Sequence, residues 1–268
     1  MEKNHTTGKL YKHWQKEQRI FQPALAGFGE KTDTHDIHTL RVSFKKLRAY
    51  TLLACTDEQD PSPLLKLDPA EQLFNALGKQ RNVEICRDLV NAISKEKNKY
   101  CPGLHRYLRH QHREAIHFSA KAIAVYESKP LLSLKYLMET EDGALMKKIG
   151  ELVGAREINI RKAFREPHRL RRLLKTIYYW ILLVTDEKSE GPFYPVLLHD
   201  ILLQLGRWND LETSRKMIRH FRKDFLPASE TEYPFLQETE AFFLQEQTAT
   251  GKKAIASAKK WLEKLKTQ

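Results

Sequence analysis

From residue 38 to residue 48 the chain reads HTLRVSFKKLR, in which apolar and cationic residues recur with the period of an α-helix. An α-helix turns by about 100° and rises by about 1.5 Å per residue, so four basic side chains fall within an arc of about 80° over about 15 Å. They are His38, Arg41, Lys45 and Arg48, with Lys46 at the margin of the row. The neighbouring stripe is apolar and consists of Ile37, Leu40, Phe44 and Leu47. The stretch therefore predicts an amphipathic helix with one face in a core and a row of positive charge beside it.

The same row recurs 130 residues later, where the chain reads HRLRRLLK from residue 168 to residue 175. The repeated residues are His168, Arg171 and Lys175, with Arg172 at the flank, and the apolar stripe beside them is Leu170, Leu173, Ile177 and Ile181. A second landmark, Leu-Gly followed by a cation, occurs at residues 77–79 and again 128 residues later at 205–207. Two landmarks with nearly the same period predict an internal duplication. We place a first helical-bundle repeat at residues 1–130 and a second at 131–268.

Helical periodicity extends over nearly the whole chain, which contains only 11 Gly and 11 Pro in 268 residues. Alternating strand-type runs between turn residues are absent from the sequence, so we predict an all-α fold. The expected helices of the first half lie at 8–24, 34–57, 63–78, 81–98 and 102–127. Those of the second half lie at 144–165, 167–186, 194–206, 208–225 and 231–267, the last with a candidate break near Gly251. The least patterned segment, 128–143, is the candidate linker.

The charge of the chain needs an explanation, because 46 Lys and Arg stand against 34 Asp and Glu, a formal net charge of +12. A solvated helix face usually mixes both signs, since opposite charges at i, i+4 stabilise a helix by about 0.2–0.5 kcal/mol per pair. Neither row has a carboxylate between its histidine and its last lysine. One such row is typical of an ordinary solvated face, but two rows at matched positions favour a polyanionic ligand. Arginine suits this role because its guanidinium can donate two parallel hydrogen bonds to a phosphate.

The motifs resemble those of the CHAD family, the conserved histidine α-helical domain. Residues 38–48 resemble the first histidine signature of the family, and residues 77–82 (LGKQRN) resemble its L-G-x-x-R-D turn. Residues 168–175 resemble the second histidine signature, and residues 205–210 (LGRWND) resemble the second turn. The resemblance covers nearly the whole chain, and the four motifs occur in the order of the family.

The resemblance implies two repeated antiparallel helical bundles, related by a pseudo-two-fold axis, around a basic central cleft that binds inorganic polyphosphate. Members of the family associate with polyphosphate-containing granules. The residues that the resemblance places on the ligand are His38, Arg41, Lys45, Lys46, Arg48, Arg81, His168, Arg171 and Lys175.

The chain also departs from the family pattern. Lys45 and Lys46 stand where arginines are usual, which keeps the charge but loses the two-bond contact with phosphate. Asn82 replaces an aspartate at the end of the first turn. Tyr178 stands in the place of an arginine, so we expect the second row to be one charge poorer and the first row to contribute more affinity.

Four further cations are candidates for phosphate contact. Lys79 and Arg207 each follow a Leu-Gly pair. Arg109 and Arg113 share a face of the helix expected at 102–127, and this face is either a third wall of the cleft or an ordinary solvated basic face.

Three residues of the helix expected at 102–127, His110, Glu114 and His117, have a spacing that places them on one helix face. An arginine neighbours them in the sequence and no fourth ligand is indicated, so we predict no metal site.

The sequence contains no P-loop, G-x-S-x-G, H-E-x-x-H or dinucleotide-binding fingerprint. We therefore expect a binding protein that is not an enzyme and uses no cofactor. Three cysteines without C-x-x-C spacing, and no apolar run near the roughly 20 residues of a membrane span, indicate a cytoplasmic protein. Three alternatives stay open: a nucleic-acid-binding protein, a phosphohydrolase or accessory subunit of one, and a module of the polyphosphate-granule surface that uses the amphipathic C-terminal helix.

Overall fold

The fold is all-helical, as the periodicity predicts, over the residues that the computed structural model describes: 8–27, 34–55, 68–127, 142–189 and 191–267. Within these ranges the elements are α1 (Lys9–Ala26), α2 (Thr34–Ala54), α4 (Asp68–Glu96), α5 (Pro102–Glu127), α6 (Asp142–Ala155), α7 (Glu157–Ala163), α8 (Pro167–Ile181), α9 (Pro195–Asp224) and α10 (Tyr233–Lys266). Most of the candidate linker lies outside the described residues.

Two pairs of predicted helices are single helices in the structure. The Leu-Gly pairs do not end helices, because α4 continues through Gly78 and α9 continues through Gly206. The predicted break in the last helix is also wrong, since α10 continues through Gly251. A glycine inside a helix costs only about 1 kcal/mol relative to alanine, which packing on either side readily outweighs. Conversely, the helix predicted at 144–165 is divided between α6 and α7 at Arg156.

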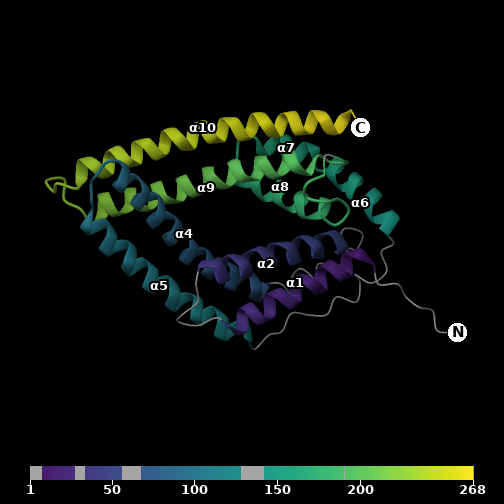
Figure 1. Cartoon of the computed structure of the whole chain (residues 1–268), viewed down its shortest axis with the longest axis horizontal. Coiled ribbons are helices and arrows are strands. Elements are labelled where there is room, and N and C mark those ends of the chain that lie inside the picture. The colour runs from purple at the N-terminus through teal and green to yellow at the C-terminus, as the bar shows by residue number, and fades with distance from the viewer. Residues whose placement is uncertain (1–7, 28–33, 56–67, 128–141, 190, 268) are drawn as a thin grey trace.

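The helices pack as neighbouring pairs around the long axis of the molecule. Helices α9 and α10 run side by side along that axis, α4 packs on α5, and α1 packs on α2 (Figure 1). Helix α8 contacts both α2 and α9, and so connects these pairs. The indole nitrogen of Trp180 in α8 donates a hydrogen bond of 2.6 Å to the carbonyl oxygen of Ala49 in α2. This bond is buried and fixes the relative position of the two helices that carry the basic rows.

Two hydrophobic clusters form the core, and each contains residues from both halves of the chain. The larger surrounds Trp180 and Trp261, and the apolar stripes predicted for α2 and α8 lie in it. The smaller lies where one end of α4 and α5 meets α9 and α10. The two halves therefore share their cores, while the internal duplication over residues 1–130 and 131–268 stays a prediction. In the described residues, no helix has both the length and the apolar character that a membrane span requires.

Candidate anion-binding site

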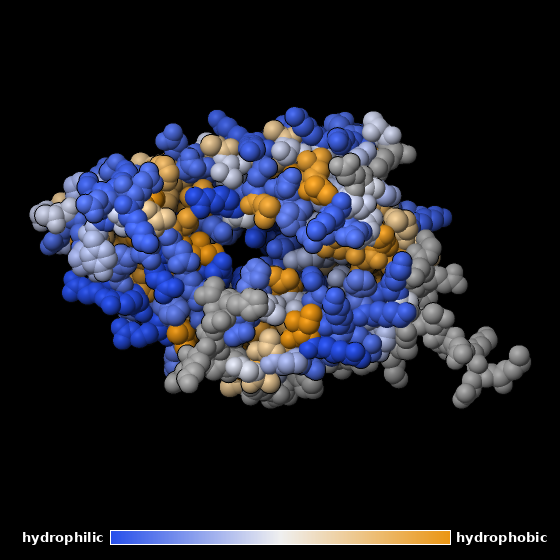
Figure 2. Space-filling model, viewed as in Figure 1, coloured by the Kyte–Doolittle hydropathy of each residue, from blue (hydrophilic) through white to orange (hydrophobic). Residues whose placement is uncertain are grey.

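The two basic rows face one cleft, with a volume of about 690 Å³. Helices α2 and α8 form its base, and α4 and α9 supply the other walls. Figure 2 shows the molecule hollowed near its middle, with mostly hydrophilic residues around the opening. Nine basic side chains line the cleft: His38, Arg41, Lys45, Arg48, Arg81, His168, Arg171, Arg172 and Lys175. Because the apolar stripes of α2 and α8 are buried in the shared core, the adjoining rows turn toward the same space.

Arg41 is held against α4 in the wall of the cleft. Its Nη1 donates a hydrogen bond of 2.5 Å to the carbonyl oxygen of Phe74, and its guanidinium carbon lies 4.1 Å from the centroid of the Phe74 ring. A Cβ atom on Gly78 would lie 2.6 Å from the same Nη1, so only glycine leaves room for the guanidinium. Burial, followed by the charges of Arg171 and Arg81, lowers the pKa of Arg41 to about 10, and Arg41 stays protonated at neutral pH.

The same environment lowers the pKa values of the two lysines of the rows, that of Lys45 the most. Burial, together with the charges of Lys175, Arg41 and Arg171, lowers the pKa of Lys45 to about 6. Burial and the two arginines lower the pKa of Lys175 to about 8. The sequence alone predicts a fully charged lysine at both positions, whereas burial and neighbouring cations disfavour the protonated form of each.

One carboxylate lines the cleft, that of Asp210 on α9. Burial raises its pKa, while a hydrogen bond from Asn209 and the charges of Arg171, Arg81 and Arg207 act in the opposite direction. His168, at the end of the second row, contacts Glu212, and its ring meets that of Trp208 edge to face at 4.7 Å between centroids. Two further ion pairs involve residues that line the cleft, Arg48 with Glu71 at 3.7 Å and Arg81 with Glu84 at 3.8 Å. These carboxylates hold individual cations in place and are fewer than the nine basic side chains.

Five of the predicted site residues do not line the cleft. Lys46 turns to α1, where its Nζ lies 2.7 Å from Oε1 of the buried Glu17. Lys46 directly follows Lys45, and successive residues of an α-helix are rotated by about 100°, so its side chain points out of the row. Lys79 lies over the ring of Phe118, with its Nζ 3.9 Å from the centroid. Arg207 is exposed outside the cleft and reaches it only through its charge on Asp210.

The remaining two, Arg109 and Arg113, line a separate surface pocket of about 380 Å³ on the α4–α5 pair, together with Arg87 and His112. The third wall expected from this face of α5 is therefore not found. Helix α5 lies on the side of α4 away from α2 and α8, an arrangement that residue spacing within one helix does not encode (Figure 1).

The second row is not one charge poorer than the first in the structure, while the larger contribution of the first row to affinity stays a prediction. The hydroxyl of Tyr178 donates a hydrogen bond of 2.7 Å to Oε1 of Glu187, and Tyr178 does not line the cleft. Arg172 does line it, so α2 and α8 each supply four basic side chains. Sequence reasoning missed Tyr179, which lines the cleft and stands four residues after Lys175. That i, i+4 spacing places both on one helix face and was the signal that would have found it.

His110, Glu114 and His117 share one helix face by their spacing, and the sequence predicts no metal site there. Across the described ranges, no group of three His, Cys, Asp or Glu side chains is arranged to hold a metal ion.

The chain is similar to the crystal structure of the CHAD domain from the plant Ricinus communis. The TM-score is 0.59 and the identity 16%, and the match covers 94% of this chain and 92% of the other. This likeness shows that the chain has a CHAD-like fold, which confirms at the level of the fold the resemblance seen in the motifs. No family model and no curated protein matches the chain.

Proposed function

We propose that this chain, with its CHAD-like fold, binds inorganic polyphosphate in the central cleft and does not hydrolyse it. The observation that carries the proposal is the balance of charge in the cleft, where nine basic side chains converge and Asp210 is the one carboxylate among the lining residues. The sequence resemblance implies the same ligand. Both rows contribute arginines, which suit phosphate oxygens because each guanidinium can donate two hydrogen bonds.

The driving force is electrostatic. The basic groups lower one another's pKa, so a polyanion between them relieves repulsion and allows Lys45 and Lys175 to take up protons. A linear chain of phosphates also releases condensed counterions when cationic side chains neutralise it, and its affinity should fall steeply with salt. Because the ligand repeats uniformly, the cleft needs no sequence-selective contacts.

Binding without turnover is part of the proposal. The histidines and lysines of the cleft could take part in proton transfer, so the hydrolysis assay below is the test of this part. The cleft offers Asp210 among cations, which suits a ligand that is held and released unchanged.

The test is a titration with polyphosphates of defined chain length at two salt concentrations, with single-stranded RNA and DNA as competitors. We expect tight binding that weakens strongly at the higher salt, and displacement only by a large excess of nucleic acid at fixed ionic strength. Equal displacement by phosphate and nucleic acid would favour the nucleic-acid-binding alternative instead.

A separate assay addresses the phosphohydrolase alternative. Release of orthophosphate from polyphosphate, measured with and without divalent cations, should stay at the level of the uncatalysed control. Metal-dependent release by the chain alone would contradict the proposal. Release only on addition of a second protein would assign the chain an accessory role.

The granule-surface alternative changes in the light of the fold. Ala254, Ala258, Trp261 and Leu262 of the C-terminal amphipathic helix are buried in the larger cluster. Their apolar stripe is thus part of the core, and removal of residues after Gly251 would unfold the protein. We propose a cytoplasmic location with association to polyphosphate granules through the cleft itself. If this is so, changes in the cleft should abolish association, while replacement of the exposed Lys259 and Lys260 by glutamine should not.

A further inference from the structure

A second chamber, of about 520 Å³, adjoins the central cleft between α4, α5 and α9. We call it the side chamber and define it by Val83, Ala115 and Met217, which line it together with aromatic rings. Asn82 of α4 and Thr213 of α9 line both the side chamber and the central cleft. The two spaces therefore adjoin at these residues.

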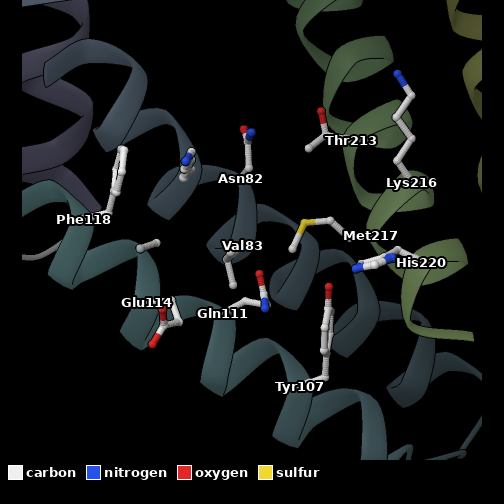
Figure 3. A pocket seen from close by; sticks show the side chains of 12 residues that line it. Asn82, Val83, Tyr107, Gln111, Glu114, Phe118, Thr213, Lys216, Met217 and His220 are labelled. Atoms are coloured by element: carbon white, nitrogen blue, oxygen red, sulfur yellow. The ribbon is translucent and has the colours of Figure 1, made fainter. Parts of the chain in front are cut away.

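The side chamber differs from the cleft in its chemistry. The surface that lines it is mostly apolar, and the rings of Tyr107 and Phe118 stand in its wall. Figure 3 shows the thioether of Met217 directed from α9 toward Val83 and Gln111, with Tyr107 rising from α5 beside them. Thioether sulfur and aromatic rings make favourable contacts with flat apolar groups. Inorganic polyphosphate is charged along its whole length and gains nothing from such a surface.

Polar groups also line the chamber, among them Glu114 and Lys79. The amide of Gln111 lies between Val83 and Tyr107, and Lys216 and His220 stand on the α9 side (Figure 3). A side-chain amide can both donate and accept a hydrogen bond, which is the pattern that the edge of a nucleobase offers. The volume also lies in the range of about 300–1,000 Å³ that is usual for small-molecule sites.

We propose that the side chamber receives the base of a nucleoside 5′-polyphosphate whose phosphates lie in the central cleft. This inference rests on the proposed function, since the cleft must bind the phosphates. It adds a class of ligand in which a flat aromatic group is joined to a phosphate chain. Phe118 supplies the stacking surface, since its side chain is 48% exposed and belongs to neither hydrophobic cluster. The ammonium group of Lys79 already lies 3.9 Å from the centroid of this ring, so the base must take the other face or displace it.

The test compares ATP with inorganic tripolyphosphate, which has the same number of phosphates and no base. Affinities of both are measured by titration calorimetry at low salt for the unmodified protein and for Phe118→Ala. Stacking of a base on an aromatic side chain corresponds to a factor of about 5 to 150 in affinity. We expect Phe118→Ala to weaken ATP at least about five-fold and to change tripolyphosphate by less than about two-fold. Phe118→Tyr, which keeps a ring, should retain ATP affinity.

Phe242→Ala is the matched control, because Phe242 lies on α10 outside both spaces and is 39% exposed. It should change neither ligand. As a measurement that needs no variant, photolabelling of the unmodified protein with 8-azido-ATP should mark the peptides that carry Phe118 or Met217, and excess tripolyphosphate should suppress the labelling.

The outcomes separate the two proposals. If tripolyphosphate binds but Phe118→Ala affects both ligands equally or not at all, or the label falls elsewhere, the side-chamber proposal is overturned and the cleft proposal stands. If neither tripolyphosphate nor longer polyphosphate binds, the proposed function itself fails.

Discussion

Helices α2 and α8 carry the same basic row, yet the structure gives the two rows different surroundings. In α2 the guanidinium of Arg41 lies on the backbone of α4 at Gly78, and the pKa of Lys45 is lowered to about 6. In α8 the pKa of Lys175 is lowered only to about 8. At Gly206, the counterpart of Gly78, an added Cβ would meet nothing within 4 Å. Residue spacing thus reproduces the row but not the contacts that set its charge.

The difference extends to the helices opposite. Position 82 of α4 and position 210 of α9 are 128 residues apart, the period of the Leu-Gly landmark, and carry Asn82 and Asp210. The charge of Asp210 raises the pKa of Lys45 in one row and of Lys175 in the other, while the groups that shift the pKa of Arg41 are burial and other cations. Because the pKa of Lys45 is lowered further than that of Lys175, we expect an anion to gain more from the α2 row.

The largest effect is expected from removal of the central arginine of each row. Arg41→Ala with Arg171→Ala should lower polyphosphate affinity more than tenfold, since each lost charged hydrogen bond is worth about 1.5–3 kcal/mol. Of the single variants, Arg41→Ala should lose more. Titration with a polyphosphate of fixed length measures all three.

The control for this pair is Arg19→Ala with Arg165→Ala, which removes the same charge from exposed sites outside the cleft. If the control loses as much affinity as the cleft variant, net charge alone explains binding and the two facing rows do not.

Substitutions in the two apolar stripes should have similar effects on the free energy of unfolding, although the two basic rows differ. Leu47 in α2 and its counterpart Ile177 in α8 are both fully buried. Either Leu47→Ala or Ile177→Ala should lower the free energy of unfolding by about 2–5 kcal/mol, measured by urea denaturation. A cost below about 1 kcal/mol at one of them would show that its helix is not anchored in the shared core.

The two lysines should differ in pH dependence. Between about pH 6, the pKa of Lys45 in the folded chain, and its ordinary value of 10.5, the unfolded chain binds the extra proton. The free energy of unfolding should therefore rise with pH across this window. A bound polyanion favours the protonated lysine, so binding at pH 7–8 should take up protons, and affinity should fall as pH rises.

Calorimetry in buffers of different ionisation enthalpy measures this uptake. Lys45→Gln should remove most of it near pH 7, and Lys175→Gln should remove it nearer pH 9. Uptake that persists unchanged in Lys45→Gln would assign the effect to other groups of the cleft.

The smallest effects are expected at the two glycines. Gly206→Ala should raise the free energy of unfolding by about 0.5–1 kcal/mol through helix propensity and leave affinity unchanged. Gly78→Ala should displace the guanidinium of Arg41 from Phe74, weaken polyphosphate binding several-fold and show little net gain in stability. Identical results for the two variants would mean that the Arg41 contact does not matter for binding.

Much of the architecture could be predicted from local pattern. The helical period placed the stripes from Ile37 to Leu47 and from Leu170 to Ile181 toward a core, and both are buried there apart from the partly exposed Leu173. Pro167 stands in the first turn of α8, where the N–H group that proline lacks would have no partner within the helix. The glycines led to wrong predictions of helix ends, because α4, α9 and α10 continue through Gly78, Gly206 and Gly251.

The sequence by itself determined the helices, their apolar faces and the two rows of basic side chains, because these depend on residue spacing along one helix. Only the tertiary structure decided that Lys46 pairs with Glu17, that Arg109 and Arg113 lie away from the cleft, and that the pKa of Lys45 is lowered to about 6. Each of these depends on which helix lies opposite and how much water is excluded between them. Burial and charge act through space, so residues far apart in the sequence set the state of a group whose position its own helix already fixes.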